Sequence, residues 1–452
     1  MAIQRVLVAN RGEIAVRIIR ACKALGIESV LATSTADRGS LAAQVADRVI
    51  CIGPSRATDS YLNQNAILAA AKGSGSDAIH PGYGFLAENP SFVKACEDNG
   101  FIFIGPQSAA VAQMGNKLAA RELANELKVP IVPGSARINR LQDAEKTANK
   151  IGFPVLFKAA AGGGGRGIRI VKEASELQNA FQSASAEAEA AFGDNTLYME
   201  RFIASARHIE IQVFGDKAGN ALHFGERDCS MQRRYQKIIE EAPAVIVPAK
   251  TLQDMRSAAI SLVKGISYQN AGTIEFIYDL KRDEFYFLEM NTRIQVEHPV
   301  TEAVTGIDLV QLQLTIAAGK ELPYQQSDIK FSNHAIECRI NAESAKRSFH
   351  PSPGRITKWA PPQDYNIRLD THCFQDYVVP PFYDSLLAKL IVSGTTRSDA
   401  IDNTHNALRH FQIDGIETNL DFLTYLSSHP DFIANTHDTR WIENNLDPFL
   451  AQ

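Results

Sequence analysis

The chain has 452 residues, 45% of them hydrophobic and 21% charged, which is typical of a soluble globular protein with two or three domains. The formal net charge of −5 gives no reason to expect nucleic acid or a membrane as a partner, and no apolar run approaches the roughly 18 residues of a membrane span. The chain starts without a secretory signal and none of its six cysteines forms a CxxC pair, so we expect a cytoplasmic protein without a disulfide framework or a zinc ribbon.

Residues 1–110 alternate between apolar strands and helices. We expect strands over 5–10, 28–34, 77–82 and 101–106, and helices over 12–26 and 61–72. This alternation predicts a parallel sheet with helices on both faces. A nicotinamide-binding Rossmann domain is disfavoured, because the first strand–helix turn, ANRGE, has one glycine where the dinucleotide fingerprint has three.

A helix is expected over 115–130, where Pro130 ends it, and the segment PIVPG (130–134) resembles a hinge. Residues 131–205 then form a small α/β unit of their own. This unit carries the most glycine-rich segment of the chain, so it is a candidate for a mobile part of the molecule.

The glycine-rich segment is KAAAGGGGRG (158–167), between expected strands over 153–158 and 168–171. Four consecutive glycines cost backbone entropy, but they let backbone N–H groups approach a polyphosphate and let the loop move as a lid. A Walker A loop is excluded, since no GK[ST] and no helix follow. Taken alone, the motif also fits a flexible surface hairpin.

Residues 208–300 are rich in expected strands. In HIEIQVFG (208–215), His208, Glu210 and Gln212 share one face, because side chains alternate along a strand. A polar row on a central strand needs partners to satisfy it. A lone histidine at such a position is more often structural than a ligand, so the row gains its meaning from its neighbours.

The segment EFYFLEMNTRIQVEHP (284–299) has the same alternation, and its polar face contains Glu289, Asn291, Arg293, Gln295 and Glu297. Buried carboxylates are costly unless a cation joins them, and oxygen ligands near a nucleotide favour Mg²⁺. The expected strand 273–279 adds a third carboxylate, Glu275. We expect the strand to break partway, so that the later members of the row point differently. The alternative is a solvated face with charge pairs.

Four cations fall within 226–243, where the sequence ERDCSMQRRYQKIIEEAP predicts a Ser- and Gln-rich loop. They are Arg227, Arg233, Arg234 and Lys237. Bicarbonate and phosphate both need fixed donors of this kind, although a surface basic cluster is the usual interpretation of a bare charge run. From about residue 330 a last unit begins, with strands expected over 334–342, 354–360 and 386–394.

Together these segments resemble the ATP-grasp superfamily, and closely resemble its biotin carboxylase family. The resemblance spans almost the whole chain and rests on RVLVANRGEIA, HPGYGFLAEN, KAAAGGGGRG, ERDCSMQRR, EMNTRIQVEHPVTE and VPPFYDSLLAKL. It implies a multidomain α/β and α+β fold. We expect an N-terminal Rossmann-like domain over 1–114, an ATP-grasp domain over 115–330 with a mobile lid at about 131–205, and a C-terminal β-rich domain over 331–447.

The resemblance implies ATP- and bicarbonate-dependent carboxylation of biotin through carboxyphosphate. Glu297 would deprotonate bicarbonate, and the catalytic set would be Glu297, Arg293, Arg339 and Lys237. The expected bicarbonate ligands are Lys237, Arg293, Gln295, Val296 and Glu297. Arg339 would stabilise the charge on the biotin oxygen, and Tyr83 would lie against biotin.

ATP with Mg²⁺ or Mn²⁺ is the cofactor that the resemblance implies. The expected ATP contacts are Lys117, Lys158, Gly162, Gly163, Gly164, Gly165, Gly167, Glu200, Ile203, His208, Gln232 and Lys237. The expected metal ligands are Glu275, Glu289 and Asn291. Three positions depart from the family pattern and concern nucleotide affinity: Arg201 in place of lysine, Tyr235 in place of histidine or asparagine, and Ile168 in place of methionine.

No Met-Lys-Met biotin-attachment segment and no carboxyltransferase region are present. We therefore expect a separate subunit that acts on a biotin carboxyl carrier protein, works with a carboxyltransferase subunit and forms a homodimer. An acyl-CoA carboxylase of fatty acid biosynthesis fits, and pyruvate, 2-oxoglutarate and urea carboxylases share this module. The alternatives are another ATP-grasp carboxylate–amine ligase and a non-catalytic nucleotide-binding subunit, although the latter predicts a missing catalytic residue and none is missing.

Overall fold

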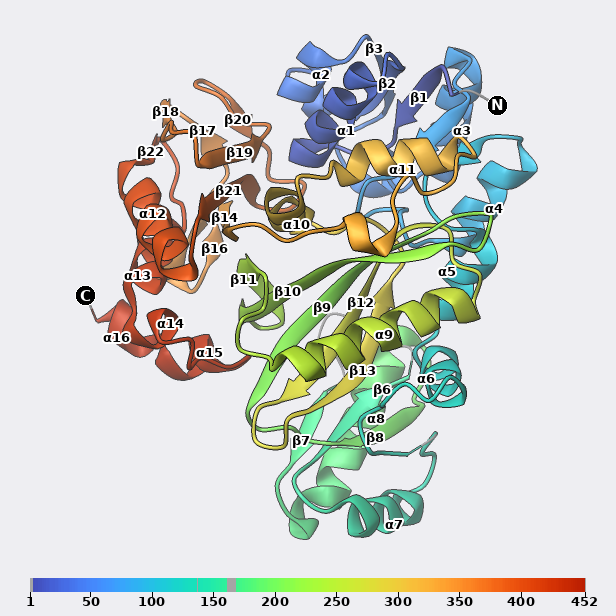
Figure 1. The fold of residues 1–452 in the computed structure, drawn as a ribbon, viewed down its shortest axis with the longest axis vertical. Coiled ribbons are helices and arrows are strands. Elements are labelled where there is room, and N and C mark those ends of the chain that lie inside the picture. Colours follow the sequence, from blue (N-terminus) through green and yellow to red (C-terminus); the bar gives the residue numbers. More distant parts are fainter. Residues whose placement is uncertain (1–2, 136, 161–167, 452) are drawn as a thin grey trace.

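The computed structural model describes residues 3–135, 137–160 and 168–451. An N-terminal unit lies at the top of Figure 1, a C-terminal unit at the left and a small three-stranded unit at the bottom, all arranged around a long central sheet. Among the described residues, no helix has the length and apolar character needed to cross a bilayer.

The N-terminal unit is a parallel sheet in the order β3-β2-β1-β4-β5. Its strands are β1 (Arg5–Val8), β2 (Glu28–Ser34), β3 (Arg48–Gly53), β4 (Ala78–His80) and β5 (Ile102–Phe103), and its helices are α1 (Gly12–Ala24), α2 (Leu41–Val45), α3 (Gln64–Ser74) and α4 (Pro90–Asp98). Val6 and Val8 pack in one core with α1, whereas Leu7 and Ala9 pack in another with α3 and α4. Both faces are therefore covered, as the alternation predicted.

The central sheet has eight strands in the order β13-β12-β9-β10-β11-β14-β21-β19, and all its pairings are antiparallel. The strands are β9 (Ala206–Gly215), β10 (Ala221–Arg233), β11 (Gln236–Ala242), β12 (Asn270–Asp279), β13 (Glu284–Asn291), β14 (His334–Asn341), β19 (Ile367–Thr371) and β21 (Leu386–Gly394). Helix α9 (Ala249–Gly265) covers one face, where Ile209, Ile211 and Val213 pack. The polar row of β9 lies on the other face.

The small unit contains the sheet β7-β6-β8, with strands β6 (Val155–Ala159), β7 (Arg169–Val171) and β8 (Leu197–Arg201). Helices α7 (Leu141–Ile151) and α8 (Leu177–Phe192) share an apolar core with this sheet. Helices α5 (Ser108–Gly115) and α6 (Lys117–Glu126) connect the N-terminal unit to it. A bridge between Ile131 and Phe287 then ties the connecting segment to β13.

The C-terminal unit donates β14, β19 and β21 to the central sheet and encloses a core of its own. Its short strands are β15 (Glu343–Ser344), β16 (His350–Pro351), β17 (Gly354–Arg355), β18 (Lys358–Ala360), β20 (Val378–Val379) and β22 (Gln412–Asp414). Helices α10 (His298–Thr305) and α11 (Leu309–Ala317) precede it, and α12 (Arg397–His410), α13 (Leu420–Ser428), α14 (Pro430–Ile433), α15 (Trp441–Asn445) and α16 (Asp447–Leu450) end the chain. Helix α11 packs on α1, as Figure 1 shows.

Several predicted elements differ from the structure. The helix expected over 115–130 is interrupted at Asn116, whose side chain accepts hydrogen bonds from the backbone at 118 and 119 and begins α6. It ends at Glu126, because Lys128 adopts a φ of 58° and Val129 donates back to Ala124. The helix expected over 61–72 spans Gln64–Ser74, and strand β3 was not predicted.

The loop expected over 226–243 is wrong, because β10 and β11 form a hairpin there. Arg234 and Tyr235 make the turn with positive φ angles of 48° and 64°. Strand β10 can contain many polar residues because these residues have buried polar partners. The amino-acid composition of this strand therefore resembles that of a loop. The strand within 284–299 breaks partway, as expected: it ends at Asn291, and α10 begins at His298.

Candidate active site

The polar row of β9 faces a fully buried arginine. Arg227 lies opposite Glu210 in the β9–β10 pairing and donates to its carboxylate. The other guanidinium N–H groups donate to Gln212 and Thr301 at 2.9 Å, to Gln295 at 2.9 Å and to Thr273 at 3.2 Å. The guanidinium is thus satisfied by two strands, one helix and the turn before that helix, which fixes the row in place.

Lys237, at the start of β11, is the cation that joins the carboxylates. Its ammonium lies 2.5 Å from Glu210 and 3.1 Å from Glu275, and it also contacts Glu297. Burial alone would lower the pKa of Lys237, but the surrounding anions outweigh this effect and raise it well above its usual value. The ammonium therefore stays charged and compensates three carboxylates, of which Glu210 and Glu297 are fully buried.

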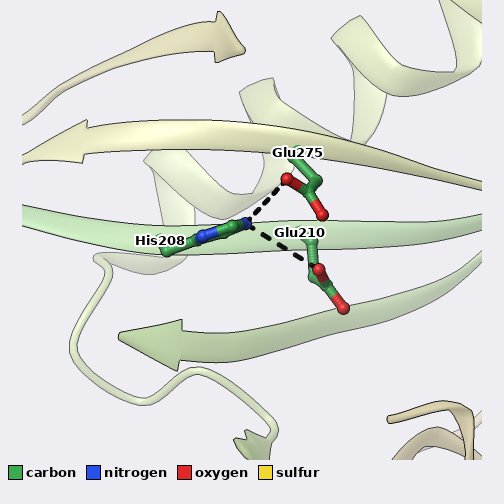
Figure 2. A group of neighbouring side chains, drawn as sticks. All are labelled: His208, Glu210 and Glu275. Atoms are coloured by element: carbon green, nitrogen blue, oxygen red, sulfur yellow. Dashed lines mark ion pairs between the residues drawn. The ribbon is translucent and has the colours of Figure 1, made fainter. Parts of the chain in front are cut away.

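His208, Glu210 and Glu275 form a compact group between the neighbouring strands β9 and β12, shown in Figure 2. The imidazole Nε2 lies 3.1 Å from Glu275 and 3.9 Å from Glu210. Burial opposes protonation of His208, but the Glu275 carboxylate overcomes it and the pKa is raised. The ligand atoms lie close enough to share a metal ion, although Lys237 already forms ion pairs with both carboxylates.

The predicted metal ligands come from the same edge of the sheet. Glu275 lies opposite Glu289 in the β12–β13 pairing, and Asn291 donates to Glu275 at 2.9 Å. Glu289 lies 3.3 Å from the ammonium of Lys117. Two carboxylates and an amide oxygen in this arrangement are the hard oxygen donors that Mg²⁺ prefers, so the residues present fit the ion.

The turn between β13 and α10 contains the remaining predicted residues of the row. Gln295 bridges Arg227 and Glu275, to which its amide donates at 2.8 Å. Arg293 does not contact Glu297 directly: it donates to Glu88 at 2.8 Å and to Asn291 at 3.1 Å. Because the strand has ended, the two side chains no longer share a face.

Glu297 stands at the N-terminal cap of α10, yet its side chain does not cap the helix. One carboxylate oxygen contacts Lys237 and the other accepts from Arg339 at 2.9 Å. Burial would raise the pKa of Glu297, but Lys237 and Arg339 lower it well below the usual range. The group is therefore an ionised, fully buried base between two cations.

Arg339 also donates to Glu240 at 2.6 Å. Glu240 lies opposite Glu337 in the β11–β14 pairing, and both side chains are fully buried. Both oxygens of Glu337 and one of Glu240 have no hydrogen-bond partner among the described residues. Burial raises the pKa of Glu240 to about 7 and that of Glu337 well above its usual value, so this pair retains a proton near neutral pH.

The predicted nucleotide contacts come from the small unit, from α6 and from the central sheet. Lys158 lies 2.5 Å from Glu200, which also pairs with Arg121. Gln232 is buried opposite Lys237 in the hairpin, whereas Ile203 is half-buried beyond the end of β8. The predicted glycine contacts Gly162, Gly163, Gly164, Gly165 and Gly167 lie outside the described residues, and Ile168 is the first residue described after them.

The departures from the family pattern are also visible beside this region. Arg201 donates to the Tyr286 hydroxyl at 2.6 Å and stacks on its ring. Tyr235 lies in the hairpin turn and is 60% exposed. Among the described residues, neither Arg201 nor Tyr235 forms a hydrogen bond or ion pair with Lys237 or Glu297.

The Tyr83 hydroxyl has a hydrogen-bond partner of its own in the N-terminal unit. Its hydroxyl donates to Glu13, in the first turn of α1. A cavity of about 280 Å³ opens beside it, and Arg11, Glu13 and His372 are among its polar lining groups. The cavity lies where the N-terminal unit meets residues 382–386 of the C-terminal unit.

Sequence reasoning assigned no role to several residues that hold this site together. Glu210 was visible as part of the β9 row, and Arg227 only as part of a charge run. Glu88, Glu240 and Lys389 gave no signal, because each meets the site through a fold contact distant in the chain.

Three family models match the chain in sequence. "Biotin carboxylase, N-terminal domain" matches residues 2–111, "Carbamoyl-phosphate synthase L chain, ATP binding domain" matches 116–325, and "Biotin carboxylase C-terminal domain" matches 337–444. Biotin carboxylase 1 of Bacillus subtilis is 49% identical over 442 residues, which is 98% of each chain.

Solved structures agree with these matches. A biotin carboxylase of Campylobacter jejuni in complex with β,γ-ATP superimposes with a TM-score of 0.95 at 48% identity, covering 98% of this chain and 99% of that one. The biotin carboxylase domain dimer of Hydrogenobacter thermophilus 2-oxoglutarate carboxylase, bound to MgADP, ADP and bicarbonate, gives 0.94 at 44% identity and covers 100% and 99%. The predicted multidomain ATP-grasp fold is thus confirmed.

Proposed function

This chain belongs to the biotin carboxylase family, and from that premise we propose how its residues carry out the reaction. The chain is an ATP-dependent ligase that carboxylates biotin with bicarbonate, and this function is favoured over that of a carboxylate–amine ligase. One observation carries the assignment of roles: Glu297 is a buried carboxylate held between Lys237 and Arg339 at the end of the polar row.

Glu297 takes the proton of bicarbonate in the first step. Its lowered pKa keeps the carboxylate ionised, and Lys237 and Arg339 keep it oriented. Gln295, Arg293 and the backbone at Val296 surround the same turn and are the proposed further ligands of bicarbonate. The deprotonated oxygen attacks the γ-phosphorus of ATP, the bond to the bridging oxygen breaks, and ADP leaves carboxyphosphate behind.

The lysines hold the nucleotide during this transfer. Lys117 and Lys158 are proposed to exchange their present carboxylate partners for phosphate oxygens, while Glu200 and Ile203 lie on the adenine side and His208 and Gln232 near the ribose and phosphates. Glu275, Glu289 and Asn291 would hold Mg²⁺ or Mn²⁺. The metal ion neutralises charge on the phosphates when it is bound.

Arg339 serves the second step. Carboxyphosphate releases CO₂, and the phosphate that departs takes the ureido proton of biotin, so the biotin nitrogen attacks CO₂. Negative charge then develops on the ureido oxygen, where the Arg339 guanidinium donates, as in an oxyanion hole. Tyr83 is proposed to lie against the biotin ring.

The proposed domains are 1–114, 115–330 and 331–447, and the second of them includes the proposed mobile lid at about 131–205. The two matched relatives above are, by their names, a biotin carboxylase and a biotin carboxylase domain dimer, which supports a homodimeric subunit here. We propose that the biotin comes on a carrier protein, which docks near Arg339 and the cavity beside Tyr83, and that a carboxyltransferase subunit uses the product. Six free cysteines fit a reducing cytoplasm.

Phosphate release from MgATP tests this function. Release should require bicarbonate and rise when free biotin is added, because biotin consumes carboxyphosphate. If release ignores biotin but responds to an amine acceptor, the carboxylate–amine ligase replaces the present proposal.

A further inference from the structure

Lys389 is a buried lysine that the reaction described above does not use. It lies on β21, directly opposite Arg339 in the β14–β21 pairing, and its side chain is fully buried. Its ammonium donates to the backbone carbonyl of Val296 at 2.8 Å and lies 3.1 Å from Glu13. Asp370 is more distant, at 3.9 Å. The lysine therefore binds the backbone of the turn that ends at Glu297.

Glu13 links Lys389 to Tyr83 at the proposed biotin site. It is buried in the first turn of α1, and the Tyr83 hydroxyl donates to the same carboxylate oxygen that faces Lys389. Burial raises the pKa of Glu13, and the Lys389 ammonium works against that rise. A continuous chain of polar contacts thus runs from Val296 through Lys389 and Glu13 to Tyr83.

This row of polar contacts joins three separate parts of the fold. Val296 belongs to the turn after the central sheet, Lys389 to the C-terminal unit, and Glu13 and Tyr83 to the N-terminal unit. A buried ion pair is a poor way to add stability, because desolvation offsets most of the attraction. It is a good way to fix geometry, since its partners have few alternatives in a dry interior.

We propose that Lys389 and Glu13 are positioning residues, which set the distance between the bicarbonate turn at Val296–Glu297 and the biotin contact Tyr83. The proposal rests on the proposed roles of Glu297 and Tyr83. It explains how two substrates meet although the residues that bind them belong to different parts of the fold. A shift of about 1 Å between reacting groups can cost about 100-fold in rate, so such a connection has a measurable effect.

The experiment is a double-mutant cycle on the KM for free biotin, with phosphate release as the assay. Lys389→Met removes the ammonium and Tyr83→Phe removes the hydroxyl. Each single change should raise the biotin KM, by about tenfold for Lys389→Met, and the double variant should resemble Lys389→Met alone. Lys389→Met should also raise the bicarbonate KM, whereas Tyr83→Phe should not, because only the lysine holds Val296.

Glu13→Gln provides a second route if Lys389→Met folds poorly, since it removes the charge and keeps the size. It should raise the biotin KM and also be non-additive with Tyr83→Phe. Arg256→Met is the matched control: it breaks the ion pair of Arg256 with buried Glu226, at 2.6 Å, away from the turn. It should lower thermal stability and leave both KM values unchanged.

Additive effects in both cycles, or a loss confined to kcat with unchanged KM values, would overturn the positioning role. A wild-type enzyme without biotin-stimulated phosphate release would refute the proposed function itself. The two failures are therefore distinguishable.

Discussion

At the scale of single residues, the site is a cluster of charges that compensate one another out of water. Lys237 contacts Glu210, Glu275 and Glu297, and Arg339 contacts Glu240 and Glu297. Exposed ion pairs contribute little, whereas removing one member of a buried pair leaves an uncompensated charge. The proposed function and the folding therefore involve the same side chains.

Glu297→Gln tests the base. The amide keeps the size of the side chain but cannot accept the proton of bicarbonate, so bicarbonate-dependent turnover should fall by about 10²–10⁴-fold. Binding of MgATP, measured by calorimetry, should persist, since Lys117 and Lys158 are untouched. Turnover close to that of the wild type would show that another group is the base.

Glu337→Gln tests the protonated pair. The folded-state pKa of Glu240 is raised from 4.5 to about 7, and that of Glu337 is also raised well above its usual value. The folded state then binds more protons than the unfolded state, so the contribution of this pair to stability is complete below about pH 4.5 and is lost as the pH rises through about 7.

The variant carries a neutral amide at all pH values, so its melting temperature relative to the wild type should rise between pH 5 and pH 8 in about that window. Thermal unfolding across this range measures the effect. A constant difference between the two proteins would mean that the pair is not protonated.

Some of these residues could be predicted from the sequence alone. Glu275, Glu289 and Asn291 lie where strand alternation placed them, on one edge of neighbouring strands. The pairing of Glu240 with Glu337 joins strands nearly a hundred residues apart, and no local pattern encodes that register. Arg293 was expected beside Glu297 but faces Glu88, because the strand ends at Asn291. The roles of these residues in catalysis stay predictions.

At the scale of elements, Arg227 joins β9, β10, β12 and the segment that ends in α10. Its partners include Glu210, Gln212, Thr273 and Gln295. A single side chain thus determines how three strands and the turn before α10 meet.

Arg227→Leu should therefore destabilise the fold strongly, by about 3–5 kcal/mol, because it leaves the buried Glu210 with one cation fewer. Urea unfolding followed by circular dichroism measures this. Arg233→Leu is the matched control on the same strand, since Arg233 lies at the edge of the hairpin and stacks on Phe349. A similar small loss in both variants would contradict the account.

Elements with a clear period were predictable, and elements without one were not. Strand β2 spans the expected residues, since its apolar run is uninterrupted. The hairpin of β10 and β11 was mistaken for a loop, because charged residues in a strand buried on both faces resemble solvated residues. Its turn uses Arg234 and Tyr235 at positive φ rather than the usual Asn-Gly, so no turn residue marks its position in the sequence.

At the scale of the whole molecule, the site draws on every unit. Tyr83 and Glu88 come from the N-terminal unit, Lys158 from the small unit and Arg339 from the C-terminal unit. A nucleotide that binds Lys158 and Lys117 together would join the small unit to the rest of the chain.

MgATP should accordingly slow amide hydrogen exchange in β6 and β8, which carry Lys158 and Glu200. Helix α12 in the C-terminal unit is the internal control and should exchange at an unchanged rate. Equal exchange in β6 and β8 with and without MgATP would show that the small unit does not hold the nucleotide.

The most direct test of the central claim is transfer of labelled carbon from bicarbonate to biotin, followed by mass spectrometry of the biotin product. With MgATP, ¹³C-bicarbonate and free biotin, the enzyme should form carboxybiotin that contains the label, and Glu297→Gln should form almost none. Unlabelled biotin, with ATP consumed and phosphate released, would contradict the assignment of this site to biotin carboxylation.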